Sequence, residues 1–317
     1  MDALILLLGL VVLVKAADFL VDGATVVAAR AKVSPLVIGL TIVSFGTSLP
    51  EMLVTLFAGL NDSADLAIAN VLGSNIANLL LVLGVAACVS PLTVRDSTIV
   101  SELPFSLTAA LLVGFLANAH LFTADPRLTI SRVDGCMLLF FFSLFMLYVF
   151  KIARTGEQES AEVPDDKGMP RAFALIALGM IGLYFGGQWV VDGAVGLARL
   201  FNVGDALIGL TIVAIGTSSP EVVASAVAAY RGQADLAVGN AVGSSIFNLL
   251  WVLGVTATVV ELPFTVISNT DLLAVIGASA LIILALVTSR SYTLRRYHGI
   301  VFVLIYAGYI AYVVQRG

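Results

Sequence analysis

The sequence has few charged residues and almost no cysteine. Of its 317 residues, 12% are charged and 60% are hydrophobic, and the mean hydropathy is +1.05, whereas an average soluble domain has roughly 25% charged and about 45–50% apolar residues. This shortage of charge excludes a soluble globular protein and makes nucleic acid an unsuitable partner. The two cysteines, Cys88 and Cys136, lack metal-ligand spacing, so we expect packing residues rather than disulfides or a zinc site.

Long apolar runs recur along the whole chain, and about 20 apolar residues suffice for one transmembrane helix. The first run follows Asp2 and no basic segment, so we interpret it as a retained helix and not as a signal peptide. Polar breaks divide the sequence into ten predicted spans, at 3–28, 35–60, 66–89, 103–119, 134–151, 172–197, 206–229, 236–260, 271–289 and 299–314. The sequence therefore predicts an all-α integral membrane protein with ten transmembrane helices.

The chain repeats itself at an offset of 170 residues. Segment 33–51 is identical to 203–221 at 12 of 19 positions, and 64–84 is identical to 234–254 at 14 of 21. An odd number of helices per half inserts the second copy upside down, which is the inverted repeat of secondary transporters. We predict a first five-helix repeat at 1–151, an acidic linker at 152–170 and a second five-helix repeat at 171–317.

Positive charge is distributed unequally between alternate loops. Eleven Lys and Arg residues fall on one side, among them Arg95 and Arg231, and four fall on the other. The richer side is expected to be cytoplasmic. We therefore predict a multi-pass protein of the inner (plasma) membrane, with both termini outside and the linker in the cytoplasm.

Two motifs with a glutamate lie in the middle of corresponding spans, GTSLPE at 46–51 and GTSSPE at 216–221. A carboxylate at mid-membrane costs several kcal/mol, so each glutamate is interpreted as functional; a protonated pair that only holds helices together is the alternative. The proline before each glutamate frees the carbonyl four residues earlier, so the helix should break there and offer oxygen ligands. The predicted side-chain ligands of these motifs are Thr47, Ser48, Glu51, Thr217, Ser218 and Glu221.

A second pair of motifs follows, GSNIANLLLVLG at 73–84 and GSSIFNLLWVLG at 243–254. In each motif a serine and an asparagine four residues apart share one helix face. Such a pattern alone is equally typical of close helix packing, but its duplication beside the glutamates predicts further oxygen ligands, namely Ser74, Asn78, Ser244 and Asn248. Carboxylates, hydroxyls, amides and carbonyls without sulfur or imidazole are the ligands of hard cations such as Ca²⁺, Mg²⁺ and Na⁺.

These paired GTSxPE and GSxIxN motifs resemble the α-repeats of the cation/calcium exchanger superfamily, most closely its bacterial and archaeal sodium/calcium antiporter branch, over the whole chain. The resemblance implies exchange of Ca²⁺ for Na⁺ by alternating access, with ions held between helices 2, 3, 7 and 8 and with helices 1 and 6 sliding as a gating pair. It implies ligand roles for the ten side chains above and for the backbone carbonyls of Ser44 and Ala214. Ca²⁺ and Na⁺ are then substrates in a lipid membrane, and neither a cofactor, an enzymatic activity nor an obligatory protein partner is expected.

The sequence departs from the family pattern at one point. Several sodium/calcium members carry an aspartate at one of the positions of Asn78 and Asn248, which are both neutral here. Ion stoichiometry and potassium dependence therefore stay open. The threonine after the motif glycine argues against the proton/calcium branch, which typically has asparagine there, but a Ca²⁺/H⁺ antiporter is the alternative that we keep.

Charges in the first helix allow two interpretations. Lys15, Asp18 and Asp22 share one face, and Asp192 repeats Asp22 in the second half. They either mark a gate near the cytoplasmic mouth or form ion pairs and helix-end charges.

Two other function classes are less well supported by the sequence. A cation channel could use the same glutamates, and an intramembrane enzyme lacks a nucleophile with a base.

Overall fold

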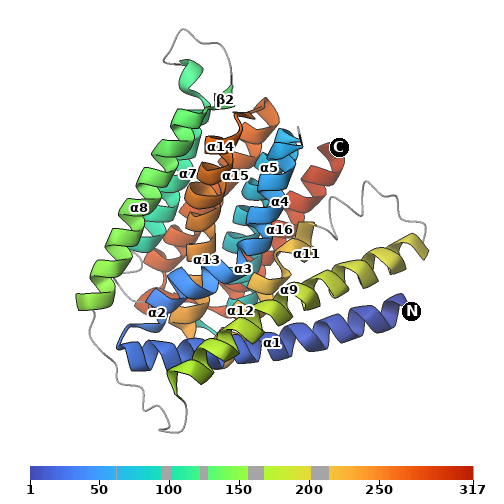
Figure 1. The fold of residues 1–317 in the computed structure, drawn as a ribbon, viewed down its shortest axis with the longest axis vertical. Coiled ribbons are helices and arrows are strands. Elements are labelled where there is room, and N and C mark those ends of the chain that lie inside the picture. Colours follow the sequence, from blue (N-terminus) through green and yellow to red (C-terminus); the bar gives the residue numbers. More distant parts are fainter. Residues whose placement is uncertain (62, 95–100, 122–127, 156–167, 201–213, 317) are drawn as a thin grey trace.

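Helices account for nearly all of the chain in this computed structural model, which describes residues 1–61, 63–94, 101–121, 128–155, 168–200 and 214–316 (Figure 1). The elements of the first half are α1 (Asp2–Ala31), α2 (Pro35–Ile38), π-helix η1 (Gly39–Val43), α3 (Ser44–Thr47), α4 (Leu49–Leu60), α5 (Ala64–Ile76), π-helix η2 (Ala77–Val82), α6 (Leu83–Val89), β1 (Leu92–Thr93), α7 (Leu103–Ala117), η4 (Ala119–Leu121), β2 (Thr129–Ile130) and α8 (Arg132–Thr155). Those of the second half are α9 (Met169–Leu200), α11 (Ala214–Thr217), α12 (Ser219–Tyr230), α13 (Ala234–Ile246), π-helix η6 (Phe247–Val252), α14 (Leu253–Val259), β3 (Leu262–Pro263), α15 (Val266–Thr288), η7 (Arg290–Tyr292), β4 (Thr293–Leu294) and α16 (Arg296–Arg316).

Most predicted spans are found as helices of membrane-spanning length. Seven of the described helices are long and apolar enough to cross a bilayer, and Pro35–Thr47 with Leu49–Leu60 forms an eighth span if this bent pair is counted as one. The predicted span 103–119 corresponds to α7, which has only 15 residues. The predicted span 206–229 corresponds to α11 and α12, and its beginning lies outside the described residues. The chain is thus a multi-pass helical membrane protein.

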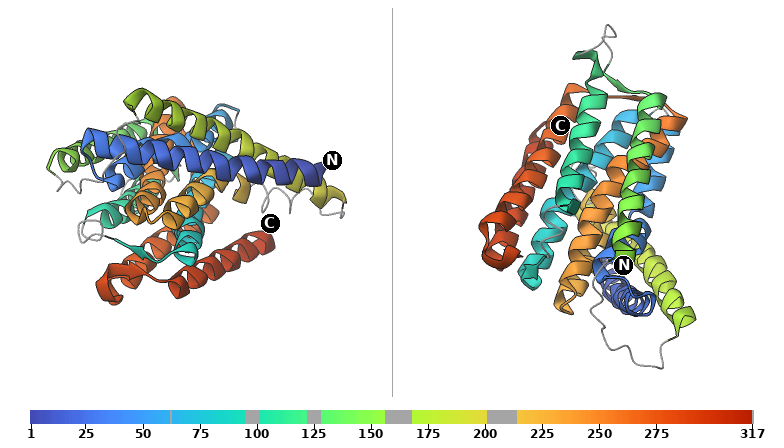
Figure 2. Two further views of the ribbon diagram at one scale, coloured as in Figure 1. Left: turned by 90° about the horizontal axis from the view of Figure 1, so that it is seen from below. Right: turned by 90° about the vertical axis from the view of Figure 1, so that its left-hand side faces the viewer.

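The helices α1 and α9 form a pair that is set apart from the others. Figure 2 shows them side by side, crossing the remaining helices at a steep angle. Glycine permits the close approach, because a Cβ added at Gly9 would lie 2.7 Å from the backbone nitrogen of Val190, and one added at Gly23 would lie 2.6 Å from the carbonyl oxygen of Ala172. We refer to these two helices as the α1–α9 pair.

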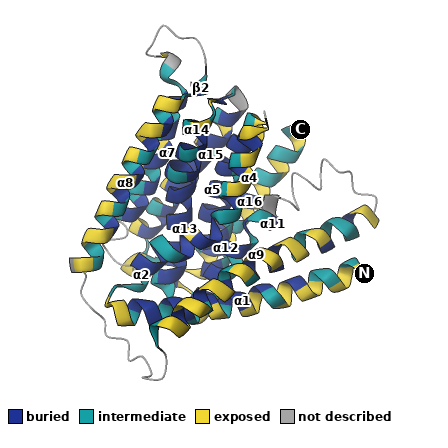
Figure 3. Ribbon diagram, viewed as in Figure 1, coloured by how far each residue is buried: buried dark blue, intermediate teal, exposed yellow. Residues whose placement is uncertain are grey.

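The core of the molecule is built on two equivalent spans, α5–η2–α6 and α13–η6–α14. In each of them 78% of the most apolar stretch is buried inside the protein. Figure 3 shows this interior as the dark blue centre of the bundle, with exposed residues along α1, α8 and α9. Those exposed faces are apolar and are suited to lipid. Cys136 lies on such a face of α8 and is exposed, so its prediction as a packing residue is wrong.

The two halves of the chain are joined to each other. In the interior, η1 packs against α13, where Gly39 and Gly239 approach so closely that a Cβ on Gly39 would lie 3.0 Å from the Gly239 Cα. At the ends of the helices, two short antiparallel ribbons pair β1 with β4 and β2 with β3. The two halves are therefore packed against each other both in the interior and at the strand pairs.

Candidate cation-binding site

Both proline-containing motifs break their helices as the sequence predicts. The first half-helix ends at Thr47, Ser48 adopts φ −85° and ψ 1°, and α4 then begins at a 47° bend. The second motif repeats this geometry, with Ser218 at φ −87° and ψ 4° between α11 and α12. Each proline is the second residue of the new helix, where its missing N–H is not needed. The glutamates consequently lie in the first turn, where the helix dipole stabilises negative charge.

The structure buries nearly all of the predicted ligand side chains. Their exposed fractions are 5% or less, except that Thr217 is half-buried. They come from the ends of α3 and α11, the starts of α4 and α12, and the middle of the α5–η2 and α13–η6 spans. We call this set the oxygen cage, and its members are Thr47, Ser48, Glu51, Ser74, Asn78, Thr217, Ser218, Glu221, Ser244 and Asn248.

Several polar atoms of the oxygen cage are buried and make no hydrogen bond within the described part of the chain. Native proteins satisfy nearly all such atoms, so a concentration of them in one place requires an explanation. Of the thirteen such atoms in the described part of the chain, eight belong to the oxygen cage, and seven of these eight are oxygens. The eight are Ser48 Oγ, Glu51 Oε2, Asn78 Oδ1, Ser218 Oγ, both carboxylate oxygens of Glu221, and Asn248 Oδ1 with its Nδ2.

The two glutamates are neighbours without a basic partner. Glu51 and Glu221 are 1% exposed and close enough for their carboxyl groups to interact electrostatically. Over the residues that the structure describes, neither forms an ion pair with Lys, Arg or His, and no three or more His, Cys, Asp or Glu side chains are grouped so that they could hold a metal ion. Two buried like charges without compensation favour binding of a cation between them.

One hydroxyl of the oxygen cage links the two halves of the chain. Thr47 Oγ1 lies 3.4 Å from Ser244 Oγ and donates a hydrogen bond to Asn240 Oδ1 at 3.2 Å. The structure thus brings Thr47 and Ser244 into direct contact, although they are 197 positions apart. The Ser44 carbonyl, a predicted ligand, already accepts the Ser48 N–H at 3.0 Å. The other predicted carbonyl ligand, Ala214, is the first residue of α11.

Two asparagines outside the predicted set hold the motif helices in place. Asn70 Nδ2 donates to Thr55 Oγ1 at 2.9 Å and to the Glu51 carbonyl at 3.3 Å. Asn240 Nδ2 donates likewise to Ser225 Oγ at 2.9 Å and to the Glu221 carbonyl at 3.5 Å. Sequence reasoning missed both residues. Their signal was present, because the asparagine is identical in the two halves at the offset of 170.

The sequence also gave no sign of the π-helices. Asn78 and Asn248 lie in η2 and η6, which occupy equivalent positions in the two halves. A π-helical turn has one residue more than an α-turn and is frequent at functional sites. The backbone between each serine and its asparagine is still α-helical, because Ala77 and Phe247 have α-helical φ and ψ angles and donate to the carbonyls of Gly73 and Gly243, four residues earlier. The four-residue spacing therefore still applies between serine and asparagine, and the π-helical turns follow it.

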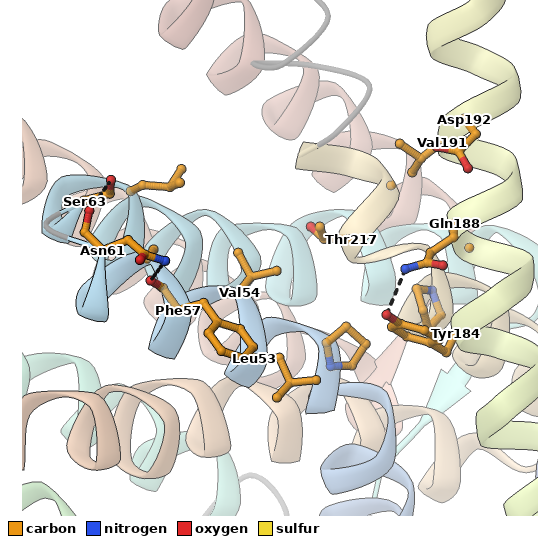
Figure 4. Close-up of a pocket in the computed structure, with 16 residues that line it drawn as sticks. Leu53, Val54, Phe57, Asn61, Ser63, Tyr184, Gln188, Val191, Asp192 and Thr217 are labelled. Atoms are coloured by element: carbon orange, nitrogen blue, oxygen red, sulfur yellow. Dashed lines mark hydrogen bonds between the residues drawn. The ribbon is translucent and has the colours of Figure 1, made fainter. Parts of the chain in front are cut away.

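Two cavities lie next to the oxygen cage. The larger, of about 810 Å³, lies between α4 and α9 and reaches Thr217, Gly216 and Pro220 (Figure 4). The smaller, of about 250 Å³, is lined by Gly46, Thr47 and residues of α9. Both cavities lie on the side of α4 that faces α9, and they reach the edge of the oxygen cage at Thr47 and Thr217.

Comparison with known proteins agrees with this geometry. The family model described as sodium/calcium exchanger protein matches residues 1–151 and 171–315. The chain belongs to the sodium/calcium exchanger family. Within this family it is 40% identical to the inner membrane protein YrbG of Escherichia coli, over 80% of this chain and 79% of that protein, and 30% identical to the sodium/calcium exchanger MaX1 of Methanosarcina acetivorans, over 97% of both.

The fold of this exchanger-family chain is that of a solved member. It superimposes on the sodium-calcium exchanger NCX_Mj, in a structure from crystals soaked with Na⁺ and Ca²⁺, with a TM-score of 0.81 and 31% sequence identity, over 98% of this chain and 97% of that one. Family membership makes the chain a membrane transporter. The resemblance inferred from the paired motifs is thereby confirmed.

Proposed function

We propose that the chain is a secondary active antiporter that exchanges Ca²⁺ for Na⁺ across the membrane by alternating access. The observation that carries this proposal is the set of buried, unpartnered oxygens around Glu51 and Glu221. Such a set of oxygens is typical of sites that bind hard cations. Na⁺ and Ca²⁺ are proposed as the two ions because the names of the family, of MaX1 and of NCX_Mj include sodium and calcium.

The proposed ligands are the ten side chains of the oxygen cage and the carbonyls of Ser44 and Ala214. Ca²⁺ binds between the two glutamates, and Na⁺ competes for overlapping oxygens. Movement of the α1–α9 pair requires that the carboxylates be neutralised, because carrying two bare charges through a dry barrier is costly. The ions are substrates, so the transport cycle needs no cofactor and no catalytic residue.

The proposed architecture is ten helices in two inverted repeats, 1–151 and 171–317, joined by a cytoplasmic linker at 152–170. The broken motif helices, and the π-helices η2 and η6, recur at an offset of 170, which supports this division. The excess of Lys and Arg on one side supports termini on the outside of the plasma membrane. The name of the relative YrbG supports an inner-membrane location.

The test is uptake of ⁴⁵Ca²⁺ into proteoliposomes loaded with Na⁺ and diluted into Na⁺-free buffer. We expect uptake with internal Na⁺ and none with internal K⁺. Uptake that follows a pH jump alone would assign a Ca²⁺/H⁺ antiporter instead, and flux without counter-ion dependence would assign a channel. The double variant Glu51→Gln/Glu221→Gln is the negative control, and robust Na⁺-dependent uptake by it would refute the proposed site.

A further inference from the structure

Two acids of α1 form ion pairs with one arginine just beyond α12. Arg231 Nη2 lies 2.6 Å from Asp18 Oδ1, and Arg231 Nη1 pairs with Asp22 Oδ1. The side chains of Arg231, Asp18 and Asp22 are 31%, 28% and 39% exposed, so water screens these pairs only in part. The ion pairs connect the α1–α9 pair to a motif helix, at a place where α1 also packs directly against α12.

The equivalent place in the other half is built differently. At the offset of 170, Gln188 replaces Asp18, Asp192 repeats Asp22, and Asn61 replaces Arg231. The amides of Gln188 and Asn61 are bonded within their own helices, to Tyr184 Oη at 2.8 Å and to the Phe57 carbonyl at 2.9 Å. Figure 4 shows the two groups on opposite sides of the larger cavity. Asp192 has no ion-pair partner in the described part of the chain.

The two motif helices α4 and α12 also differ in how far their equivalent residues are exposed. Val54 of α4 is 39% exposed and lines the cavity that separates α4 from α9. Its repeat counterpart in α12, Ala224, is 2% exposed. The structure is therefore a conformation that is closed between α1 and α12 and open between α4 and α9.

We propose that Arg231, Asp18 and Asp22 form a one-sided lock, which stabilises this conformation and has no counterpart for the opposite one. The inference rests on the proposed alternating access. In an inverted repeat the second conformation exchanges the roles of the halves, so Gln188 and Asp192 close against Asn61. That contact has one acid and no cation, whereas the present one has two ion pairs. Contacts made in one state only shift the equilibrium toward that state.

The size of the shift follows from the exposure of the lock. Partly exposed ion pairs are weak, so two of them change the ratio of the two conformations about threefold to tenfold. In the proposed orientation Arg231 is on the cytoplasmic side, since it belongs to the Lys- and Arg-rich loops. The lock therefore biases the carrier toward the conformation that opens to the outside.

The test measures the accessibility of two cysteines in the full-length protein in lipid nanodiscs, with Na⁺ and Ca²⁺ present so that the carrier can cycle. Val54→Cys and Ala224→Cys are made separately in a Cys88→Ser/Cys136→Ser background and labelled with a charged maleimide. With Arg231→Gln we expect labelling at position 54 to slow and labelling at 224 to accelerate, so that the ratio of the two rates falls about threefold to tenfold. Arg231→Lys, which keeps the charge, should restore the original rates.

A second variant builds the missing lock. Asn61→Arg with Gln188→Asp places a cation and two acids at the open end, and should shift both labelling rates in the same direction as Arg231→Gln. If neither variant changes the ratio of the two rates in protein that exchanges Na⁺ for Ca²⁺, the lock is wrong. If the ratio shifts in protein whose wild type shows no Na⁺-dependent Ca²⁺ uptake, the lock stands and the proposed function is wrong.

Discussion

The core spans and the α1–α9 pair are made of similar apolar residues but are held in different ways. The apolar stretches of α5–η2–α6 and α13–η6–α14 are 78% buried, whereas those of α1 and α9 are 33% and 28% buried. Hydrogen bonds of Asn70 and Asn240 connect the core spans to the motif helices. In the described part of the chain, the α1–α9 pair contacts the motif helices through apolar side chains and through the partly exposed ion pairs of Arg231 with Asp18 and Asp22. The core is thus suited to fix ligand positions, and the pair is suited to move.

The α1–α9 pair contacts the motif helices at the motif glycines. A Cβ at Gly46 would lie 2.1 Å from Met180 Cε, and one at Gly216 would lie 2.1 Å from Val191 Cγ2. Both partners belong to α9. The absence of a side chain at these two points would let α9 side chains pass over the motifs in the proposed sliding of the pair. Substitutions in the core should therefore change ion affinity, and substitutions at this contact should change the rate.

The largest effect is expected from Glu221→Gln. The amide keeps the size of the side chain but removes one of the two charges proposed to bind Ca²⁺, so Na⁺-dependent Ca²⁺ uptake should fall by about 100-fold or more. Glu102→Gln is the matched control, because Glu102 is equally buried but bonded to Tyr148 on α8. Its uptake should stay within about threefold of wild type. A similar loss in both variants would mean that burial of any glutamate, rather than the cage, determines transport.

An intermediate effect is expected from Asn240→Leu. The change leaves the Thr47 hydroxyl and the Glu221 carbonyl without their amide partner, and an unsatisfied buried group costs about 1–3 kcal/mol. We expect Ca²⁺ affinity, measured by calorimetry on purified protein, to fall about tenfold. Asn240→Gln and a thermal unfolding curve separate misplacement of ligands from general destabilisation. Unchanged affinity with a lower melting temperature would reduce Asn240 to a structural role.

The smallest effect is expected from Gly46→Ala. The new methyl group meets the flexible end of Met180, so Ca²⁺ affinity should change less than twofold, while the maximal exchange rate falls about fivefold because α9 must pass over it. Gly73→Ala is the matched control, since nothing lies within 4 Å of its added Cβ. Stopped-flow uptake at saturating Ca²⁺ measures the rate. An altered affinity with an unaltered rate would contradict the division between core and pair.

Sequence reasoning predicted what lies along single helices. Apolar length predicted the ends of the seven described spanning helices and of the bent pair to within a few residues, and the proline before each glutamate predicted the breaks at Ser48 and Ser218. Contacts between side chains of different helices could not be predicted in this way. The Thr47 bond to Asn240 joins residues 193 positions apart, and no periodicity within one helix reveals such a partner. The pairing of Asp18 and Asp22 with Arg231 was hidden for the same reason.

The bond between Thr47 and Asn240 has a consequence for biosynthesis. The partners of Thr47 lie 193 and 197 residues downstream. At about 5–20 residues per second, the ribosome needs on the order of 10–40 seconds to make that stretch. During this interval Glu51 is in the membrane before the second half of its binding site exists. Because a bare carboxylate at that depth is costly, we expect the nascent first half to keep this acid protonated or in contact with water until the second half has inserted.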